Sequence, residues 1–150
     1  MISSAPRTVT VSAVAIVDDC LLAEAQHSAR LLTVRKRGTT RFQLPGGKPE
    51  TGEDALAAAL RETAEEIGVD LPRAEIRPLG HWLGAAANDD ADLVSAEVFI
   101  ISAARLGRQQ PRALAEIAEL RWVSADTMDT ELLAPLIQAF VLPAASAQLS

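Results

Sequence analysis

The length, composition and charge of the chain restrict the kinds of protein it can be. It has 150 residues, of which 49% are hydrophobic, which is typical of one globular domain and not of a disordered segment. A net charge of −6 and a pI near 4.9 argue against a surface that coats extended nucleic acid, because such surfaces are basic. We expect a single domain over residues 1–150, with loose tails at about 1–6 and 143–150.

Cysteine content and apolar stretches predict the compartment. Cys20 is the only cysteine, which excludes an internal disulfide and a cysteine zinc cluster and agrees with a reducing environment. The N-terminus lacks a basic segment followed by a long apolar core, so no secretory signal is apparent. The longest apolar stretch, Leu132–Leu142, contains Pro135 and Gln138 and is too short to span a bilayer. We therefore expect a cytoplasmic protein with no membrane partner.

The first third of the chain carries strand patterns separated by turns. The predicted strands are 8–17, 30–34 and 42–44. Cys20–Ser28 is expected to be a connector, helical in part. The turn 35–41 is basic, so it is either a solvated hairpin loop or a cationic rim for substrate phosphates. Arg35 is the best candidate for a phosphate contact, as the first residue after the predicted strand.

A helix is predicted in the middle of the chain. The stretch that ends at Gly68 has few helix breakers and is rich in Ala, Leu, Arg and Glu, which are strong helix formers. Thr51 with Asp54 is a variant of the capping box, so the helix should begin near Gly52 or Glu53. Gly68 suits the position that ends a helix.

The two faces of this helix differ in character. An apolar, core-facing stripe is formed by Leu56, Ala59, Leu60, Thr63 and Ile67. Glu62, Glu65 and Glu66 are neighbours on another side, where like charges cost about 0.2–0.5 kcal/mol per pair. The helix dipole disfavours the two anions in the last turn by about 0.3–1 kcal/mol each. The face is either solvated or the site of a divalent cation such as Mg²⁺, which would reverse both effects.

The remainder of the chain predicts further strands and a final helix. Strand patterns cover 76–83, 93–103 and the end of 114–123. The second of these places Val94, Ala96, Val98 and Ile100 on one face. Ser124–Asp126 is expected to cap a last helix, whose apolar stripe is Leu132, Leu133, Leu136, Ile137 and Phe140. Strands on both sides of one central helix, with a second helix at the end, predict an α+β or α/β/α sandwich.

The glycine-rich turn and the central helix share a motif of fixed spacing. It consists of Gly47, Glu53, Arg61-Glu62, Glu65-Glu66, Gly68 and Val69. These positions match the Nudix box, and the one departure is Thr63, which stands where an apolar residue is usual and still offers a methyl group. The chain therefore resembles the Nudix hydrolases, of the MutT-like kind. The resemblance implies a mixed curved β-sheet flanked by helices, and homodimers are frequent among similar proteins.

The resemblance also implies metal-dependent hydrolysis of a phosphoanhydride bond. The family uses Mg²⁺ or Mn²⁺ to clamp phosphates, which accords with catalysis by positioning and electrostatics. By resemblance, Glu62, Glu65 and Glu66 hold the metal, with Glu66 as the foremost ligand. The main-chain carbonyl of Gly47 is the expected additional ligand.

Other residues of the box are expected to support the site or to contact substrate. Glu53 and Arg61 resemble the family's supporting pair, in which the arginine ties the first glutamate to the helix. Gly46 and Gly47 let the backbone approach metal and phosphates closely. Lys48 either touches a phosphate or faces water.

The general base is a carboxylate that the motif does not single out. The candidates are Glu62, Glu97, Glu116 and Glu119. Glu116 is favoured because it precedes a predicted strand in the later half of the chain, and its alternative is a plain surface charge.

The substrate is inferred mainly from the absence of sequence signatures that are typical of other substrate classes. The region beyond the box, Gly84–Ala87, lacks the proline of many ADP-ribose enzymes, and the chain has no tyrosine of the kind that dinucleoside polyphosphate enzymes carry. Leu31–Arg35 is only a fragment of the coenzyme A signature. Trp82 and Trp122 either stack a base or, more commonly for such large aromatics, pack in the core.

Without these signatures, the chain resembles the small MutT-like enzymes, which cleave nucleoside triphosphates to monophosphate and pyrophosphate. A second enzymatic candidate is an ADP-ribose or ADP-sugar pyrophosphatase. The rival from another class is a noncatalytic Nudix module that binds a nucleotide and regulates. Such a module would be expected to lose box carboxylates, whereas this chain keeps them all.

Overall fold

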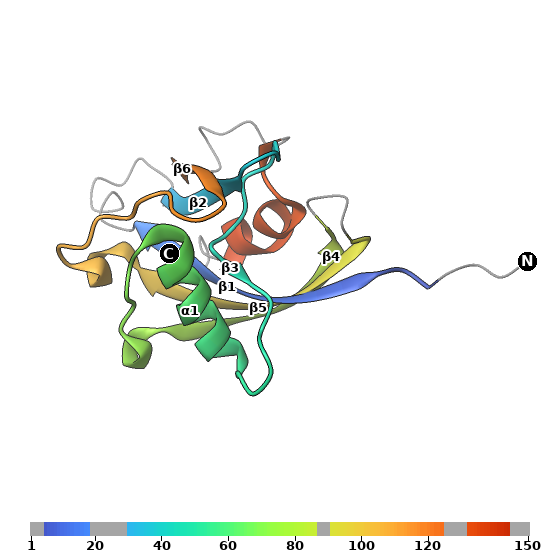
Figure 1. Ribbon diagram of the computed structural model, residues 1–150, viewed down its shortest axis with the longest axis horizontal. Coiled ribbons are helices and arrows are strands. Elements are labelled where there is room, and N and C mark those ends of the chain that lie inside the picture. The colour runs from blue at the N-terminus through green and yellow to red at the C-terminus, as the bar shows by residue number, and fades with distance from the viewer. Residues whose placement is uncertain (1–4, 19–29, 87–90, 125–131, 145–150) are drawn as a thin grey trace, which may run out of the picture.

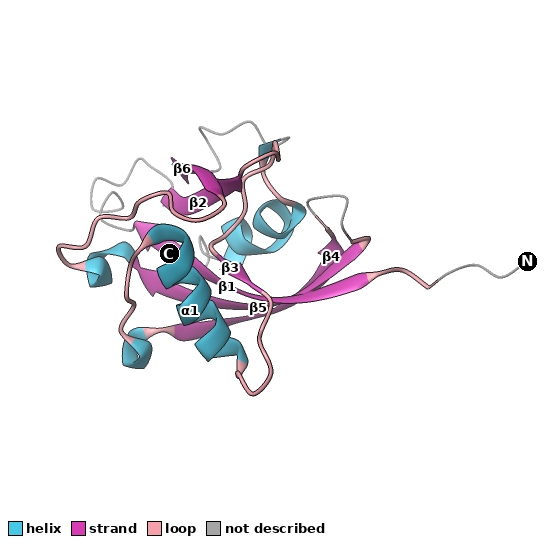
Figure 2. Ribbon diagram, viewed as in Figure 1, coloured by secondary structure: helices cyan, strands magenta, loops and turns pink. Residues whose placement is uncertain are grey.

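The structure is a computed structural model, and it describes residues 5–18, 30–86, 91–124 and 132–144. The connector expected at Cys20–Ser28 and the cap residues Ala125 and Asp126 lie outside the described residues. Figure 1 shows a twisted sheet with helices packed on it, and Figure 2 separates the helices from the strands by colour. None of the described helices combines the length and apolar composition needed to cross a lipid bilayer.

The sheet is mixed and has six strands. They are β1 (Thr8–Asp18), β2 (Arg30–Lys36), β3 (Gly46–Gly47), β4 (Arg77–Ala85), β5 (Leu93–Ser102) and β6 (Ile117–Val123). The order is β4-β5-β1-β2-β6, with β3 paired to β1 beside this path. β1 and β5 run parallel, and the other pairs are antiparallel. The helical elements are α1 (Ala55–Ile67), η2 (Arg73–Glu75), η3 (Ala103–Leu106) and the π-helical η5 (Ile137–Val141).

The two faces of the sheet bury two separate cores. Alternate residues of β1 point to opposite sides, so that Ala13 and Ala15 join one core while Val14 and Ile16 join the other. The first core packs against residues of the C-terminal helix, and the second packs against α1. This confirms the predicted α/β/α sandwich with a mixed sheet. The two tryptophans pack against these cores, Trp82 on the first and Trp122 on the second.

The sheet contains a gap that positions the functional site. Within the described residues, β1 pairs with β2 at the last two residues of β1 and the first two of β2, and the strands then separate. Segment 42–47 fills the gap. Gln43 exchanges both backbone hydrogen bonds with Val34 of β2 at 2.7 and 2.8 Å, and β3 pairs with Ser12 and Ala13 of β1. The chain just before α1 is thereby built into the middle of the sheet.

The central helix begins later than the sequence predicts. α1 starts at Ala55, because the Asp54 side chain is the N-cap and its Oδ1 accepts a hydrogen bond from the Ala57 N–H at 2.7 Å. Gly52 has a φ of +84°, which is incompatible with a helix. The end is as predicted, with Gly68 in the left-handed conformation. Ile67, Ala59 and Thr63 of the expected stripe are fully buried, and the two leucines are partly buried.

Two strand boundaries also differ from the prediction. β2 continues through Arg35 and Lys36, where the predicted strand ended at Val34. Residues 42–44 make only isolated bridges, and the short strand is the glycine pair β3. Both differences come from pairing with distant segments, β6 and β1, which local residue patterns do not report.

Candidate active site

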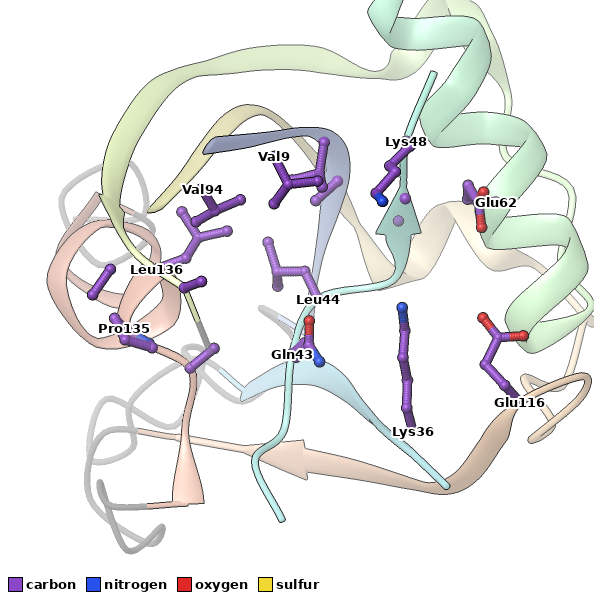
Figure 3. A pocket seen from close by; sticks show the side chains of 17 residues that line it. Val9, Lys36, Gln43, Leu44, Lys48, Glu62, Val94, Glu116, Pro135 and Leu136 are labelled. Carbon is purple, nitrogen blue, oxygen red and sulfur yellow. The ribbon is translucent and has the colours of Figure 1, made fainter. Parts of the chain in front are cut away.

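A cavity of about 370 Å³ opens beside the gap in the sheet. One end of the cavity is charged: Figure 3 shows Glu62 of α1 and Glu116, just before β6, facing each other there. Lys36 and Lys48 line the same end. Two carboxylates and two ammonium groups at one mouth suit a ligand that carries both phosphates and a cation.

The other end of the cavity is apolar. Val9 of β1, Val94 of β5, and Pro135 and Leu136 of the C-terminal segment line it. Gln43 lies between the two ends, as Figure 3 shows. None of the described residues that line the cavity is aromatic, so neither tryptophan is placed to stack a ligand there. An elongated ligand with one anionic end and one flat, less polar end matches this lining.

Glu66 is the most unusual carboxylate of the site. Its side chain is only 1% exposed, and its Oε1 accepts a hydrogen bond from the Gly46 N–H at 2.9 Å. Its Oε2 is buried and has no hydrogen-bond partner among the described residues. Burial is the main reason that the pKa of Glu66 rises to about 8, and the nearby Glu62 and Glu116 raise it further, against the effects of the Gly46 N–H and Lys36.

The glycine pair of β3 allows this close packing. A Cβ on Gly46 would lie 2.2 Å from the carbonyl oxygen of Ser12, and one on Gly47 would lie 2.5 Å from the carboxyl carbon of Glu62. Only glycine fits at either position without a shift of its neighbours. The backbone before α1 therefore lies directly against two carboxylates of the helix.

Arg61 ties the loop before α1 to the helix. Its Nε and Nη2 donate to the two carboxylate oxygens of Glu53 at 2.7 and 2.9 Å, and Nη2 also donates to the Lys48 carbonyl at 3.1 Å. The Arg61 guanidinium lowers the pKa of Glu53 to about 2, aided by the Glu50 N–H. The pair has the geometry that the motif predicted for a supporting arginine and glutamate.

The same guanidinium reaches the two outer carboxylates. Arg61 Nη1 donates to Glu62 Oε1 at 3.0 Å and to Glu65 Oε2 at 3.3 Å. The Glu65 side chain is 55% exposed and does not line the cavity. Of the three helical glutamates, Glu62 therefore lines the cavity, Glu66 is buried behind it, and Glu65 faces outward.

The candidates for the general base lie in different places. Glu116 lines the charged end of the cavity, whereas Glu97 and Glu119 do not. Glu97 sits on β5 directly opposite His81 of β4. Glu119 accepts hydrogen bonds from Arg121 and Arg35, which lower its pKa. Geometry thus favours Glu116 over these two, and Glu62 stays a candidate.

Lys36, and not the predicted Arg35, lines the charged end of the cavity. Because β2 continues to Lys36, alternation places Lys36 on the same face as Val34, toward α1, and Arg35 on the opposite face. Arg35 is committed to Glu119 at 3.3 Å and to the Thr39 carbonyl at 3.0 Å. The correct strand end would have identified Lys36 from the sequence.

Gln43 is a further cavity residue that sequence reasoning missed. Its backbone is fixed by Val34, yet its Nε2 is buried without a hydrogen-bond partner among the described residues. The only sequence signal was a polar residue between the apolar neighbours Phe42 and Leu44.

The residues at the charged end fit a hard divalent cation by their chemistry. Mg²⁺ and Mn²⁺ prefer oxygen ligands, and Glu62 and Glu116 supply carboxylates that act electrostatically on Glu66, whose Oε2 is unpartnered among the described residues. In the described part of the chain, however, no three acidic, histidine or cysteine side chains stand close enough together to hold an ion as they are. The buried oxygen without a partner is the observation that points to a ligand there.

Comparison with known proteins establishes the class to which this fold and site belong. The family model of the NUDIX domain matches residues 6–141. The chain therefore belongs to the NUDIX family and is a Nudix hydrolase, as the motif predicted. Nudix hydrolases generally use divalent metal cations. No curated protein matches the chain.

Solved structures support the fold. The chain is similar to the NUDIX domain of NrtR from Shewanella oneidensis, crystallised with ADP ribose, with a TM-score of 0.70, 16% identity, and coverage of 99% of this chain and 91% of that one. It is similar to a MutT NUDIX hydrolase from Burkholderia pseudomallei, with a TM-score of 0.65, 23% identity, and coverage of 93% and 98%.

A third similar structure is larger than this chain. A MutT/nudix family protein from Enterococcus faecalis gives a TM-score of 0.61 at 18% identity over 81% of this chain. The match covers 46% of that protein, so this chain spans about half of its length.

Proposed function

We propose that this protein hydrolyses a nucleoside triphosphate to the monophosphate and pyrophosphate, with Mg²⁺ or Mn²⁺ as cofactor. The observation that carries the proposal is the buried, unpartnered Glu66 Oε2 behind a cavity with one charged and one apolar end. A triphosphate with its cation suits the charged end, and the nucleoside suits the apolar end.

Glu62 and Glu66 are the residues that would hold the cation, together with the main-chain carbonyl of Gly47, whereas Glu65, which the motif also predicts as a ligand, faces away from the cavity. When bound, the cation neutralises charge on the phosphate oxygens. A bound cation would also favour the ionised form of Glu66, which burial and the nearby Glu62 and Glu116 disfavour. Glu53 and Arg61 hold the loop that carries Gly47 against α1.

The chain's own side chains then direct a water molecule to the phosphorus. Glu116 accepts a proton from the water as the water oxygen bonds to one of the phosphorus atoms beside the α–β bridging oxygen. The bond from that phosphorus to the bridging oxygen breaks, and the bridging oxygen leaves on the other product. Lys36 and Lys48, at the same end of the cavity, stabilise the negative charge of the phosphates.

ADP-ribose or an ADP-sugar is the alternative substrate. It also places a diphosphate next to a nucleoside, and the similar NUDIX domain of NrtR was crystallised with ADP ribose. A noncatalytic nucleotide-binding role is the rival from another class, and the retention of every box carboxylate weighs against it.

A substrate panel tests the proposal. The purified protein is incubated with Mg²⁺ or Mn²⁺ and with ribo- and deoxyribonucleoside triphosphates, ADP-ribose and ADP-glucose, and products are separated by anion-exchange chromatography. We expect monophosphate and pyrophosphate from a triphosphate, and no product after chelation of the metal. A Glu66→Gln preparation purified in parallel shows whether a contaminating phosphatase contributes. Preference for ADP-ribose would move the assignment to the alternative, and no turnover of any substrate would overturn hydrolysis.

A further inference from the structure

The segment before β6 is fastened to the C-terminal end of α1. The Arg112 N–H donates to the Ile67 carbonyl and the Leu114 N–H donates to the Glu66 carbonyl, both at 2.9 Å. The last carbonyls of a helix have no partner within the helix, so this segment caps them. A Cβ on Gly68 would lie 3.0 Å from Leu114 Cδ1, which shows how closely the segment packs.

The other side of the segment is held by Arg37, from the turn after β2. The Arg37 N–H donates to the Glu116 carbonyl at 2.8 Å, and its Nη2 donates to the Ala115 carbonyl. The Ile117 N–H closes the turn on the Leu114 carbonyl at 2.9 Å. Glu116 therefore lies in a segment that is hydrogen-bonded to α1 on one side and to the turn after β2 on the other.

Ala115 has an unfavourable backbone conformation in this turn. Its φ is +51°, and it is the one described residue other than glycine with a positive φ. An L-residue adopts this left-handed conformation at a cost, so the surrounding contacts must maintain it. The guanidinium of Arg37 on the Ala115 carbonyl is such a contact.

We propose that Arg37 is a positioning residue for Glu116, holding the turn at Ala115 so that the Glu116 carboxylate faces Glu62 across the cavity. This rests on the proposed function, in which Glu116 accepts the proton. Without the Arg37 contact, Ala115 relaxes toward a negative φ. Leu114 stays fixed to α1 and the Glu116 carbonyl stays on the backbone N–H of residue 37, so the change at Ala115 reorients the Glu116 side chain between these two anchors. Arg37 does not line the cavity, which favours a role through the turn over a direct phosphate contact.

A double-mutant cycle distinguishes positioning from substrate binding. We expect Arg37→Ala to lower kcat about tenfold with little change in KM, because a misplaced catalytic group slows the chemical step. In the Glu116→Gln background the same substitution should cause no further loss. Arg37→Lys, which keeps a donor of shorter reach, should fall in between. Arg77→Ala, an exposed arginine on β4 at the opposite edge of the sheet, is the matched control and should leave kcat unchanged.

A second pair of variants, at Ala115, tests the turn itself. These variants keep the proposal testable if Arg37→Ala does not fold. Ala115→Gly should retain kcat, because glycine adopts a positive φ readily. Ala115→Val should reproduce the loss of Arg37→Ala, because a β-branched residue is strained there. A loss of kcat from Arg37→Ala that persists in Glu116→Gln, or a rise in KM alone, would overturn the positioning role. Wild-type kcat in Glu116→Gln would overturn it too, while leaving hydrolysis itself intact.

Hydrogen exchange gives a readout that does not depend on activity. We expect the amide of Ile117, whose hydrogen bond to the Leu114 carbonyl closes the turn, to exchange faster in Arg37→Ala, with the Leu114 amide and the amides of β5 unchanged. If the wild-type protein cleaves no nucleotide but this exchange response is seen, the proposed function fails and the fastening of the turn stands. Unchanged exchange at the Ile117 amide would overturn the fastening, whatever the activity.

Discussion

The carboxylates at the two ends of α1 have opposite environments. Glu53, just before the helix, faces Arg61 through two hydrogen bonds, and this pairing lowers its pKa to about 2. Glu66, in the last turn, has one backbone donor, a buried oxygen without a partner, and a pKa raised to about 8. Both carboxylate oxygens of Glu53 have hydrogen-bond donors within the protein, whereas one oxygen of Glu66 has none among the described residues.

The difference in environment separates the two proposed roles, a supporting carboxylate in Glu53 and a cation-binding one in Glu66. A carboxylate already neutralised by an arginine has little to offer a cation, whereas a buried oxygen that lacks a donor is stabilised when a cation arrives. The sequence motif treats both glutamates as fixed positions, so the difference is visible only in the structure.

The largest effect is expected from Glu66→Gln. The amide keeps the shape and still accepts the Gly46 hydrogen bond, but it loses the charge that would bind the cation. We expect kcat to fall on the order of 10³-fold with the melting temperature maintained or raised. The control is Glu75→Gln, an exposed glutamate of η2 paired only with Arg105 among the described residues. Turnover near that of the wild type would remove Glu66 from the mechanism.

A smaller loss of kcat is expected when the pair of Arg61 and Glu53 is broken. Arg61→Ala removes the ties to Glu53, Glu62 and the Lys48 carbonyl together. We expect kcat to fall about 10²-fold, because the loop with Gly47 is no longer held in place, and the melting temperature to fall as well. Arg61→Lys should recover little, since lysine cannot make the two-pronged contact. Full activity in Arg61→Ala would show that the pair has no supporting role.

Gln43→Leu tests the middle of the cavity. The Gln43 Nε2 has no hydrogen-bond partner among the described residues, and the side chain lies between the charged and apolar ends, so we expect it to contact the base of the proposed nucleotide. Removing it should raise KM for the preferred nucleotide about tenfold and leave kcat nearly unchanged. The measurement is kcat and KM for each of the four bases. An unchanged ranking of the bases would exclude Gln43 as a specificity residue.

The smallest effect is a pH dependence of stability with opposite signs at the two ends. Glu66 binds its proton more tightly in the folded state, so without metal its contribution to the free energy of unfolding falls as pH rises from about 4.5 to about 8. Glu53 binds its proton less tightly in the folded state, so its contribution is lost as pH falls from 4.5 toward about 2.

Thermal melts of the metal-free protein across pH test this difference. We expect the melting temperature to decline between pH 5 and pH 8 in the wild type, and a flatter profile in Glu66→Gln. Added Mg²⁺ should raise the melting temperature most at the upper end of this window, where Glu66 is ionised. A rising profile over the same window in the wild type would contradict the environment assigned to Glu66.

The sequence predicted the helix and its motif because their signals are local. The apolar stripe, the glycine at the end of α1 and the spacing of Glu53 to Arg61 depend on helical periodicity alone. The start of the helix was wrong because two caps compete within four residues, and Asp54 forms the cap while Thr51 does not.

The cavity was beyond local reasoning because it depends on the separation of β1 from β2. Lys36 faces α1 only because β2 pairs onward with β6, and Gln43 reaches the cavity only because its segment fills the gap. Glu116 was favoured as a candidate from its position before a predicted strand, whereas the segments that hold it, the end of α1 and Arg37, are distant in sequence.

Binding of Mn²⁺, followed by electron paramagnetic resonance of the free ion, tests directly whether Glu66, in the last turn of α1, belongs to a metal site. We predict that the wild type binds the ion at neutral to slightly alkaline pH, that Glu66→Gln weakens binding at least about tenfold, and that Glu53→Gln changes it little. Equal affinity in Glu66→Gln and the wild type, or no binding by the wild type with a nucleotide present, would contradict the role given to Glu66.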